Sequence, residues 1–406
     1  SSMILIASIL TSQAVFFPTM SYASNEGVGI VNAVARFQRA YSLAKARNSA
    51  FAKKIERISA LPDPPSSIST LQGGEGVTVI LHMGESVRSD RVSINGYERN
   101  TTPWLKSCSH LINFPNCTAA APFTKSASMA ILTDARGDME FNISPELEAS
   151  SRCIMDFFST NSFECYGFFN SIAIGKQDTW GVSFEKAQAM FTAKAKKVYE
   201  LGANNCHKPK EQIPQIAEVL RNEAGNKFLL VNNYGSHIPF YAYDLQHAVF
   251  LPSNAESLYN SPQSNAAAAE EVNNAYDNTI VYTDEYIHDL IDMLKGTPFL
   301  YIYVSDHGEP LGDGGKWARY QKDFHKAEWS KVAFFIIYSP EFEQLHPHFK
   351  VALANLRKNS TMATAHENIF HTLLGIFGIQ TPYYEAIHDL SSPNPEPYQG
   401  PSCDRN

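Results

Sequence analysis

The sequence predicts an α/β protein whose central sheet is largely parallel and covered by helices on both faces. Five short runs of apolar, strand-favouring residues recur along the chain, at 77–83, 163–169, 227–233, 299–305 and 332–338. Strands that are buried on both faces show such near-continuous apolar runs. Helical patterns lie between these runs, and alternation of strands and helices is typical of a parallel sheet.

The composition fits a large globular protein with ample core. The chain has 406 residues, of which 44% are hydrophobic and 18% are charged, and its formal net charge is −8. A disordered polyelectrolyte is excluded, because such chains are rich in charge and poor in apolar residues. A dedicated nucleic-acid binder normally carries a basic excess, so no nucleic-acid partner is expected.

Residues 1–60 are expected to form a membrane-proximal segment that contains an apolar run at 4–17. This run is shorter than the roughly 18 residues that cross a bilayer as a helix. Three interpretations remain open: a truncated membrane helix, a secretory signal with its small-residue site at Ser21-Tyr22-Ala23, and an amphipathic helix packed on the body.

A basic helical stretch occupies residues 30–57, where seven Lys or Arg residues accompany a single acid, Glu56. Apolar residues recur in it at helical spacing. Such a helix suits an anionic membrane surface, and the alternative is an ordinary helix with a solvated basic face.

The next segment, 61–76, is rich in Pro, Gly and Ser and predicts a linker. The main domain is expected at 77–385 and a C-terminal tail at 386–406. Within the main domain, residues 271–296 carry apolar side chains near the helical period and predict a long helix that stops at Gly296.

Six cysteines are present, and none forms a CxxC pair, so a structural zinc knuckle is not expected. In an exported protein an even number of cysteines suggests disulfides. Cys108 with Cys117 closes the shortest loop and is the first choice, and Cys153 with Cys165 is the second. Buried free thiols are the alternative.

Polar side chains follow three of the predicted strands at their carboxyl ends, where α/β proteins collect their chemistry. Glu85 follows the first strand, His237 the third, and Asp306 with His307 the fourth. Carboxylates and imidazoles from separate strands are what a hydrolytic metal site needs. Adjacent strand residues point to opposite faces, so Asp306 and His307 can share a metal only if the strand has already ended. Gly308 directly after them makes such a bend easy.

Three strings now identify a resemblance: GESVRSDRVSINGYERNTTPWL (84–105), YDNTIVYTD (276–284) and VSDHGEPLG (304–312). They resemble the phosphoethanolamine transferases of the alkaline phosphatase and sulfatase superfamily, which include the colistin-resistance enzymes that modify lipid A. The similarity spans about 76 to 380. It implies an alkaline-phosphatase-like fold for 77–385 as the catalytic domain, and the periplasmic domain of an inner-membrane protein.

The resemblance also implies a zinc site and a nucleophile. Zinc would be held by Glu85, Asp306, His307 and a nucleophilic Thr, which family spacing places at Thr124. Thr124 begins a small-residue run that can open a helix, whose free N–H groups stabilise phosphate. The competing hydroxyls are Ser86, Thr118, Ser126 and Ser128. A plain helix N-cap is the alternative role of Thr124.

Further residues match substrate or second-metal positions of the family. His237 and His325 are expected to act on the phosphate or the leaving oxygen, and Asn232 and Lys125 to contact substrate. Asn232 stands where the colistin-resistance group has a His, so one zinc is expected and a second is in doubt. The Cys/Ser-x-Pro-x-Arg string of sulfatases is absent near Thr124.

The resemblance implies transfer of phosphoethanolamine from phosphatidylethanolamine to a lipopolysaccharide acceptor, lipid A or a core sugar, through a phospho-threonine intermediate. The membrane surface would be a further partner. One alternative is a phosphodiesterase or sulfatase-type hydrolase of the same superfamily. Another is an inactive module that binds headgroups.

Overall fold

The computed structural model describes residues 60–71, 75–135, 151–170, 185–201, 208–240, 248–260, 262–263, 265–317 and 327–400. The predicted membrane-proximal segment up to residue 59, His325, Cys206 and Cys403 lie outside these residues. Among the helices within the described ranges, none is both long and apolar enough to cross a membrane.

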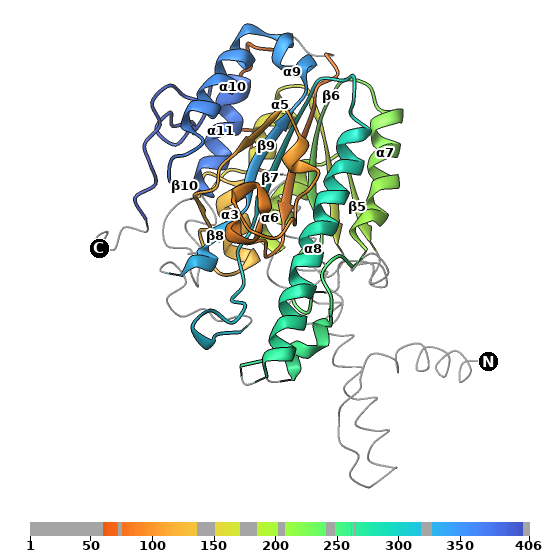
Figure 1. Cartoon of the computed structure of the whole chain (residues 1–406). Coiled ribbons are helices and arrows are strands. Elements are labelled where there is room, and N and C mark those ends of the chain that lie inside the picture. Colours follow the sequence, from red (N-terminus) through yellow and green to blue (C-terminus); the bar gives the residue numbers. More distant parts are fainter. Residues whose placement is uncertain are drawn as a thin grey trace, which may run out of the picture. The chain divides into compact units, whose positions relative to one another are not determined.

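Seven strands form the central sheet in the order β2-β9-β7-β1-β6-β4-β5. Within the described residues, neighbouring strands run parallel except on either side of β9, which is antiparallel to both β7 and β2. The predicted largely parallel sheet is therefore confirmed (Figure 1). The strands are β1 (Thr78–Gly84), β2 (Leu111–Asn113), β4 (Phe163–Asn170), β5 (Lys197–Leu201), β6 (Asn226–Asn232), β7 (Phe299–Ser305) and β9 (Phe334–Tyr338).

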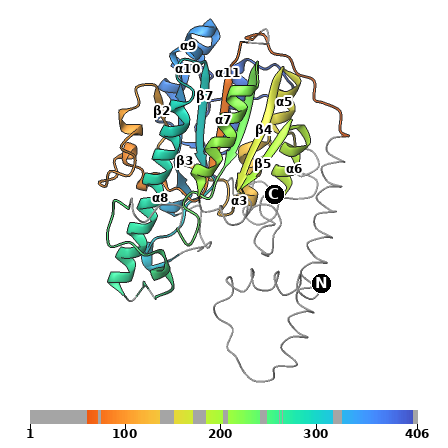
Figure 2. The ribbon, with the colours of Figure 1, turned by 90° about the vertical axis from the view of Figure 1, so that its right-hand side faces the viewer.

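Helices cover both faces of this sheet (Figures 1 and 2). Along β1, Val79 and Leu81 belong to one apolar core and Ile80 to the other, as the two-residue period of a strand requires. The first core contains side chains of α3 (Thr124–Leu132), α5 (Ile154–Thr160), α6 (Glu185–Lys194), α9 (Pro340–Leu345), α10 (Pro347–Asn359) and α11 (Glu367–Phe377). The second contains those of α7 (Ile213–Asn222) and α8 (Ala266–Asp292).

A second, three-stranded sheet, which the sequence did not predict, lies in the order β10-β3-β8. Its strands are β3 (Cys117–Thr118), β8 (Lys331–Val332) and β10 (Thr364–Ala365). They are two residues long each and show no periodicity. Short 3₁₀ turns complete the fold: η2 (Ser89–Arg91), η3 (Ser93–Asn95), η4 (Leu105–Ser107), η7 (Pro209–Gln212), η9 (Ala255–Tyr259), η10 (Asp313–Gly315) and η12 (Glu328–Ser330).

The long helix α8 differs from its prediction at both ends. It begins at Ala266 because the side chain of Asn265 accepts a hydrogen bond from Ala268 N and caps the first turn. It ends at Asp292, and Gly296, with a φ of +78°, follows in a separate turn. The predicted stop at Gly296 is therefore four residues too late.

The predicted linker and tail both contact the main domain. Thr70 Oγ1 donates to Phe377 O at 2.6 Å, and Leu71 is buried in the first core. In the predicted C-terminal tail, Leu390 lies in the same core and Tyr398 N donates to Ala363 O. The boundaries at 76 and 385 therefore do not separate independent bodies, although the roles assigned to the four ranges stay predictions.

The two predicted disulfides are absent, because Cys108, Cys117, Cys153 and Cys165 are free cysteines. Cys108 packs against the second core while Cys117 belongs to the first, so the sheet separates them. The other two thiols are each engaged locally. Cys165 donates to Phe163 O, and Cys153 accepts a backbone hydrogen bond at the start of α5.

We predict that these four thiols are reduced in the native protein. Burial raises the pKa of the Cys117 thiol to about 12 and also raises the pKa of Cys108, so both should react slowly until the chain unfolds. Alkylation in urea without reductant should label all four positions, as read by peptide mass spectrometry. A disulfide-linked peptide that contains any of them would contradict the structure.

Candidate metal centre

Two neighbouring strands deliver acidic side chains to the same edge of the sheet. Strands β1 and β7 pair in parallel up to Gly84 and Ser305, so the residues that follow them leave the sheet at the same level. Glu85 follows the first strand and Asp306 with His307 follows the second. One ligand atom from each of these three residues lies within 4.8 Å of the other two.

The three side chains are buried and close. His307 Nε2 lies 3.3 Å from Glu85 Oε1 and 3.4 Å from Asp306 Oδ2, and the Asp306 side chain has no exposed surface. Asp306 Oδ1 accepts hydrogen bonds from Ser86 N and His307 N. The other carboxylate oxygen, Oδ2, is buried without a hydrogen-bond partner among the described residues.

The electrostatics of the cluster favour a cation. Burial and the charge of Glu85 raise the pKa of Asp306 above its usual value. Burial raises the pKa of Glu85, but the hydrogen bond and charge of His307, the charge of His237 and the hydrogen bond from Ser86 together outweigh burial and lower this pKa to about 2. Two buried carboxylates thus share the imidazole of His307, and Asp306 Oδ2 has no hydrogen-bond partner among the described residues. One nitrogen and several oxygens from buried, converging side chains suit Zn²⁺.

Thr124 is the first residue of helix α3, as the sequence predicted, and the N-cap is Phe123. The interpretation of Thr124 as a plain N-cap is therefore wrong. Its hydroxyl instead donates to Glu85 Oε2 at 3.2 Å, and it lies near enough to Asp306 to lower the pKa of that carboxyl. The first N–H groups of α3 have no intrahelical partner. They lie at the N-terminal end of the helix, which is the end that begins with Thr124.

The competing hydroxyls are engaged elsewhere or less accessible. Thr118 Oγ1 accepts from Lys331 Nζ, and Ser128 donates to Lys125 O. Ser86 donates to Glu85 Oε1 at 2.8 Å but is fully buried, whereas Thr124 is half-buried. Thr124 is the one of these residues that both contacts the cluster and is accessible to a substrate.

The loop after β6 contacts the cluster by backbone groups. Ser236 N donates to Glu85 O at 2.9 Å, and a Cβ on Gly235 would lie 2.9 Å from the same oxygen. His237 is near enough for its charge to lower the pKa of Glu85. Asn232 is buried, and its amide donates to Met83 O at 3.2 Å, which ties β6 to β1. Lys125 is exposed on α3.

The sequence reasoning missed Arg88, which joins the two loops that carry the cluster. Its guanidinium binds both carboxylate oxygens of Asp90, at 2.8 and 2.6 Å, and both of Asp313, at 2.6 and 3.1 Å. A Cβ on Gly308 would collide with Trp329 O and the Arg88 side chain. Close packing therefore requires a glycine directly after His307, and its part in a bend stays a prediction. The Arg-x-Asp spacing within the 84–105 string was the available signal.

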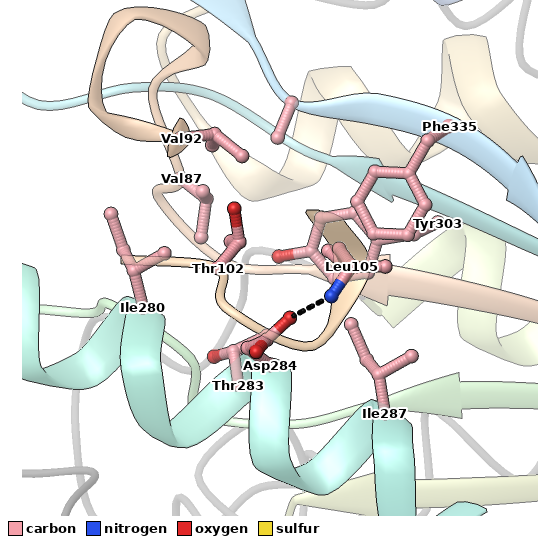
Figure 3. A pocket seen from close by; sticks show the side chains of 11 residues that line it. Val87, Val92, Thr102, Leu105, Ile280, Thr283, Asp284, Ile287, Tyr303 and Phe335 are labelled. Atoms are coloured by element: carbon pink, nitrogen blue, oxygen red, sulfur yellow. Dashed lines mark hydrogen bonds between the residues drawn. The ribbon is translucent and has the colours of Figure 1, made fainter. Parts of the chain in front are cut away.

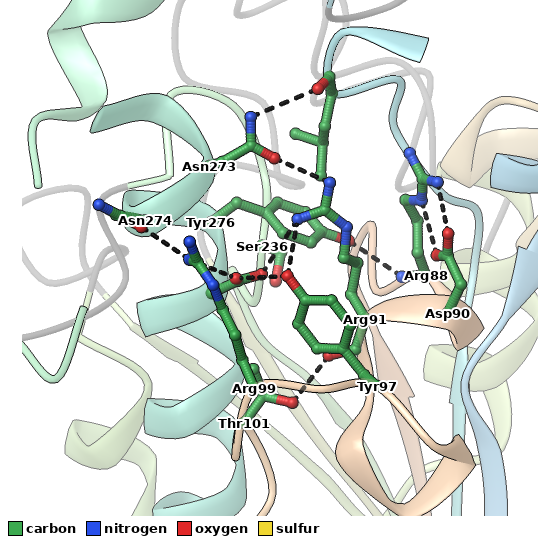
Figure 4. A network of polar contacts seen from close by, with 12 residues as sticks. Arg88, Asp90, Arg91, Tyr97, Arg99, Thr101, Ser236, Asn273, Asn274 and Tyr276 are labelled. Carbon is green, nitrogen blue, oxygen red and sulfur yellow. Dashed lines mark hydrogen bonds and ion pairs between the residues drawn. The ribbon is translucent and has the colours of Figure 1, made fainter. Parts of the chain in front are cut away.

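A second network fastens the 84–105 loop to α8 (Figure 4). The fully buried Asp277 accepts from Tyr97 Oη at 2.8 Å and from Arg99 Nη1 at 2.9 Å, and it lies 3.5 Å from Arg91 Nη1. Tyr276 Oη donates to Ser86 O at 2.6 Å, directly beside the cluster. Two of the three strings thus also hold one another in place.

A small pocket beside this network is not the reaction site (Figure 3). Aliphatic and aromatic side chains form most of its lining, among them Leu105, Ile280, Ile287 and Phe335. Asp284 also lines the pocket, and its carboxylate accepts hydrogen bonds from Trp104 N and Leu105 N. None of the three cluster residues contributes to the lining, so we interpret it as a packing gap under the docked loop.

Comparisons with known proteins agree with this geometry. A family model described as Sulfatase matches residues 77–379. Phosphoethanolamine transferase EptA of Salmonella typhimurium is 26% identical over 341 residues, which are 80% of this chain and 57% of that protein. The chain thus spans little more than half the length of this relative.

Solved structures share the fold. The zinc complex of the C-terminal periplasmic domain of EptC from Escherichia coli superimposes with a TM-score of 0.67 at 22% identity, covering 82% of this chain and 90% of that one. The integral membrane protein lipooligosaccharide phosphoethanolamine transferase A from Neisseria meningitidis gives a TM-score of 0.64 at 19% identity, covering 95% and 76%. The predicted alkaline-phosphatase-like fold is confirmed.

We predict that Asp306→Asn removes zinc binding and stabilises the zinc-free protein. The amide keeps an oxygen for Ser86 N and His307 N, and it removes the repulsion between two buried carboxylates. Zinc at a hundred times its dissociation constant should stabilise the wild type by about 2.7 kcal/mol and the variant not at all. Thermal unfolding with and without zinc measures both effects, and equal zinc stabilisation of the two proteins would exclude Asp306 as a ligand.

We also predict that Asp277→Ala destabilises the protein by about 2 to 4 kcal/mol, because it leaves two arginines and a tyrosine facing a buried gap. Urea unfolding measures this loss. Lys295→Ala, which removes a solvent-exposed ion pair with Asp292, is the control and should leave the urea midpoint unchanged. A similar midpoint for Asp277→Ala and the wild type would mean that the network does not hold the loop.

Proposed function

The chain belongs to the sulfatase family, and we propose that it transfers phosphoethanolamine from phosphatidylethanolamine to a lipopolysaccharide acceptor, through a covalent intermediate on Thr124. The observation that carries this proposal is the contact of a half-buried, helix-initiating Thr124 hydroxyl with the buried Glu85–Asp306–His307 cluster. The likeness to named phosphoethanolamine transferases supports the choice of transferred group.

Glu85, Asp306, His307 and the Thr124 hydroxyl would hold one zinc ion. When bound, zinc supplies Lewis-acid chemistry that makes a coordinated hydroxyl more acidic and neutralises charge on a phosphoryl oxygen. The unused Asp306 Oδ2 and the excess of carboxylate over imidazole support this fit. The amide nitrogen of Asn232 donates to Met83 O, and a second ion at this position stays an open part of the proposal.

In the first half-reaction, Thr124 Oγ1 forms a bond to the phosphorus of phosphatidylethanolamine, and the bond from phosphorus to the diacylglycerol oxygen breaks. Glu85 Oε2 accepts the hydrogen bond of the hydroxyl, so it orients the attacking oxygen. The Thr124 hydroxyl gives up its proton and the diacylglycerol oxygen gains one, and His237 and His325 are the candidates to carry that proton. The first N–H groups of α3 would stabilise the negative charge on the phosphoryl oxygens.

In the second half-reaction, a hydroxyl or protonated phosphate oxygen of the acceptor attacks the same phosphorus and loses its proton. The bond to Thr124 Oγ1 breaks, and Thr124 Oγ1 takes up a proton and becomes a hydroxyl again. A covalent intermediate divides one difficult transfer into two easier steps. Both substrates are membrane lipids, so we propose that the domain works at the periplasmic surface of the inner membrane. The membrane and periplasmic contexts of the similar solved structures support this location.

A hydrolase of the same family is the alternative that a specific observation favours, because the matching family model is described as Sulfatase. The two activities share the first half-reaction and differ in the acceptor. Release of free phosphoethanolamine without an acceptor-lipid product would favour the hydrolase. Absence of stoichiometric zinc and of any adduct would favour an inactive headgroup-binding module.

We predict that incubation with a fluorescent phosphatidylethanolamine yields diacylglycerol and a phosphoethanolamine adduct on Thr124, mapped by peptide mass spectrometry. Thr124→Ala should lower turnover by about a thousandfold or more, because the attacking oxygen is removed. Ser128→Ala, which removes a hydroxyl one turn later on the same helix, is the matched control and should keep both turnover and adduct. An adduct elsewhere, with Thr124→Ala still active, would overturn the assignment.

A further inference from the structure

His366 lies between the two halves of the candidate centre although no part of the proposed reaction uses it. It joins β10 to α11, and its side chain has no exposed surface. Its Nδ1 is 3.3 Å from Ala120 N, and its Nε2 is 2.9 Å from Ser305 O. One imidazole therefore bridges two chain segments that are far apart in the sequence.

The two contacts define the protonation of the ring. A backbone N–H can only donate, so Nδ1 must accept from Ala120, and Nε2 must carry the proton that it donates to Ser305 O. Burial lowers the pKa of His366 to about 3, which keeps the ring neutral. A neutral ring with the proton on Nε2 satisfies both backbone groups at once.

Each bridged segment positions one half of the centre. Ala120 lies four residues before Thr124, and Ser305 directly precedes Asp306. The Ser305 hydroxyl in turn accepts from Val87 N at 2.6 Å and donates to His307 O. By contrast, the hydroxyl of Thr124 reaches the cluster through one long hydrogen bond of 3.2 Å to Glu85. The placement of Thr124 therefore depends on what holds the segment behind it.

We infer that His366 is a positioning residue, whose Nδ1 and Nε2–H hold the segment before Thr124 at a fixed distance from the strand end that carries Asp306 and His307. This role rests on the proposed function for its effect on turnover. A displacement of about 1 Å between a nucleophile and its partners costs on the order of a hundredfold in rate. Substrate binding need not change, because His366 is buried away from solvent.

Three substitutions at position 366 test the two hydrogen bonds of the ring, one at a time and together. The carboxamide oxygen of His366→Asn lies near the place of Nδ1 and can still accept from Ala120 N. The carboxamide nitrogen of His366→Gln lies near the place of Nε2 and can still donate to Ser305 O. His366→Phe keeps the ring volume and removes both contacts. We expect kcat to fall about a hundredfold in the Phe variant and about tenfold in each half-variant, with KM within twofold of the wild type.

The control variant is His348→Phe. His348 Nε2 bonds Gly375 O at 2.8 Å, so this change also removes a histidine-to-carbonyl hydrogen bond, at the far end of the same helix α11. It should lower the thermal midpoint and leave kcat unchanged. If His366→Phe lowers the midpoint to the same extent and also keeps its kcat, then His366 only stabilises the fold and the inference is wrong.

Two readouts do not depend on turnover. ¹⁵N-histidine NMR of the protein should find His366 neutral with its proton on Nε2, and a proton on Nδ1 would overturn the inference. Chelator competition should find zinc bound about tenfold more weakly by His366→Phe than by the wild type, and equal affinity would also count against it. A wild type that binds zinc but forms no Thr124 adduct would refute the proposed function, and these two readouts would still decide the role of His366.

Discussion

Two carboxylates are buried side by side where β1 and β7 end, and the imidazole of His307 lies within 3.4 Å of both. Removing charges from water costs several kcal/mol per ion unless hydrogen bonds and opposite charge compensate. The surrounding chain supplies donors accordingly. Ser86 N and His307 N donate to Asp306 Oδ1, and the hydroxyls of Ser86 and Thr124 donate to Glu85. These donors do not compensate all of the negative charge, and Asp306 Oδ2 accepts no hydrogen bond among the described residues. A metal ion would neutralise the remaining charge.

The same constraint explains why the identifying strings of this sequence are long. A cluster of like charges is stable only if the loops that carry it cannot move apart. Arg88 joins the loop after β1 to Asp313 in the loop after β7, and Asp277 joins Tyr97 and Arg99 to α8. Arg88, Tyr97, Arg99 and Asp277 therefore act indirectly, by holding together the loops that carry Glu85, Asp306 and His307.

Local patterns explain which features could be predicted from the sequence. The strands beneath the site are continuous apolar runs, so their position and the equivalence of their ends could be inferred, and with them the convergence of Glu85 and Asp306. The start of α3 at Thr124 followed from a run of small residues. The cysteine pairs were misjudged because loop length says nothing about the sheet that separates Cys108 from Cys117. Arg88 and His366 were missed because the contacts that join them to other loops span long stretches of the chain: Arg88 reaches Tyr276 and Asp313, and His366 reaches Ala120 and Ser305. The contact of Arg88 with Asp90 is local, but no local pattern reports the others.

Thr124 reaches the centre by a different route from the other three residues. The carboxylates and His307 leave the main sheet directly, whereas the chain before Thr124 passes through β3 of the small sheet. That sheet is fastened to the main one on both of its edges. On the β8 side, Ala333 N donates to Val87 O and Ser305 N donates to Ala333 O. On the β10 side, the ring of His366 reaches Ser305 O. Ser305 makes one hydrogen bond on each of these sides, so the distance between Thr124 and the cluster depends in part on how the two sheets meet at this residue. The main sheet alone cannot set that distance, because Thr124 is not carried by it. The buried His366, which lies outside the cluster, therefore contributes to the position of Thr124 relative to the cluster.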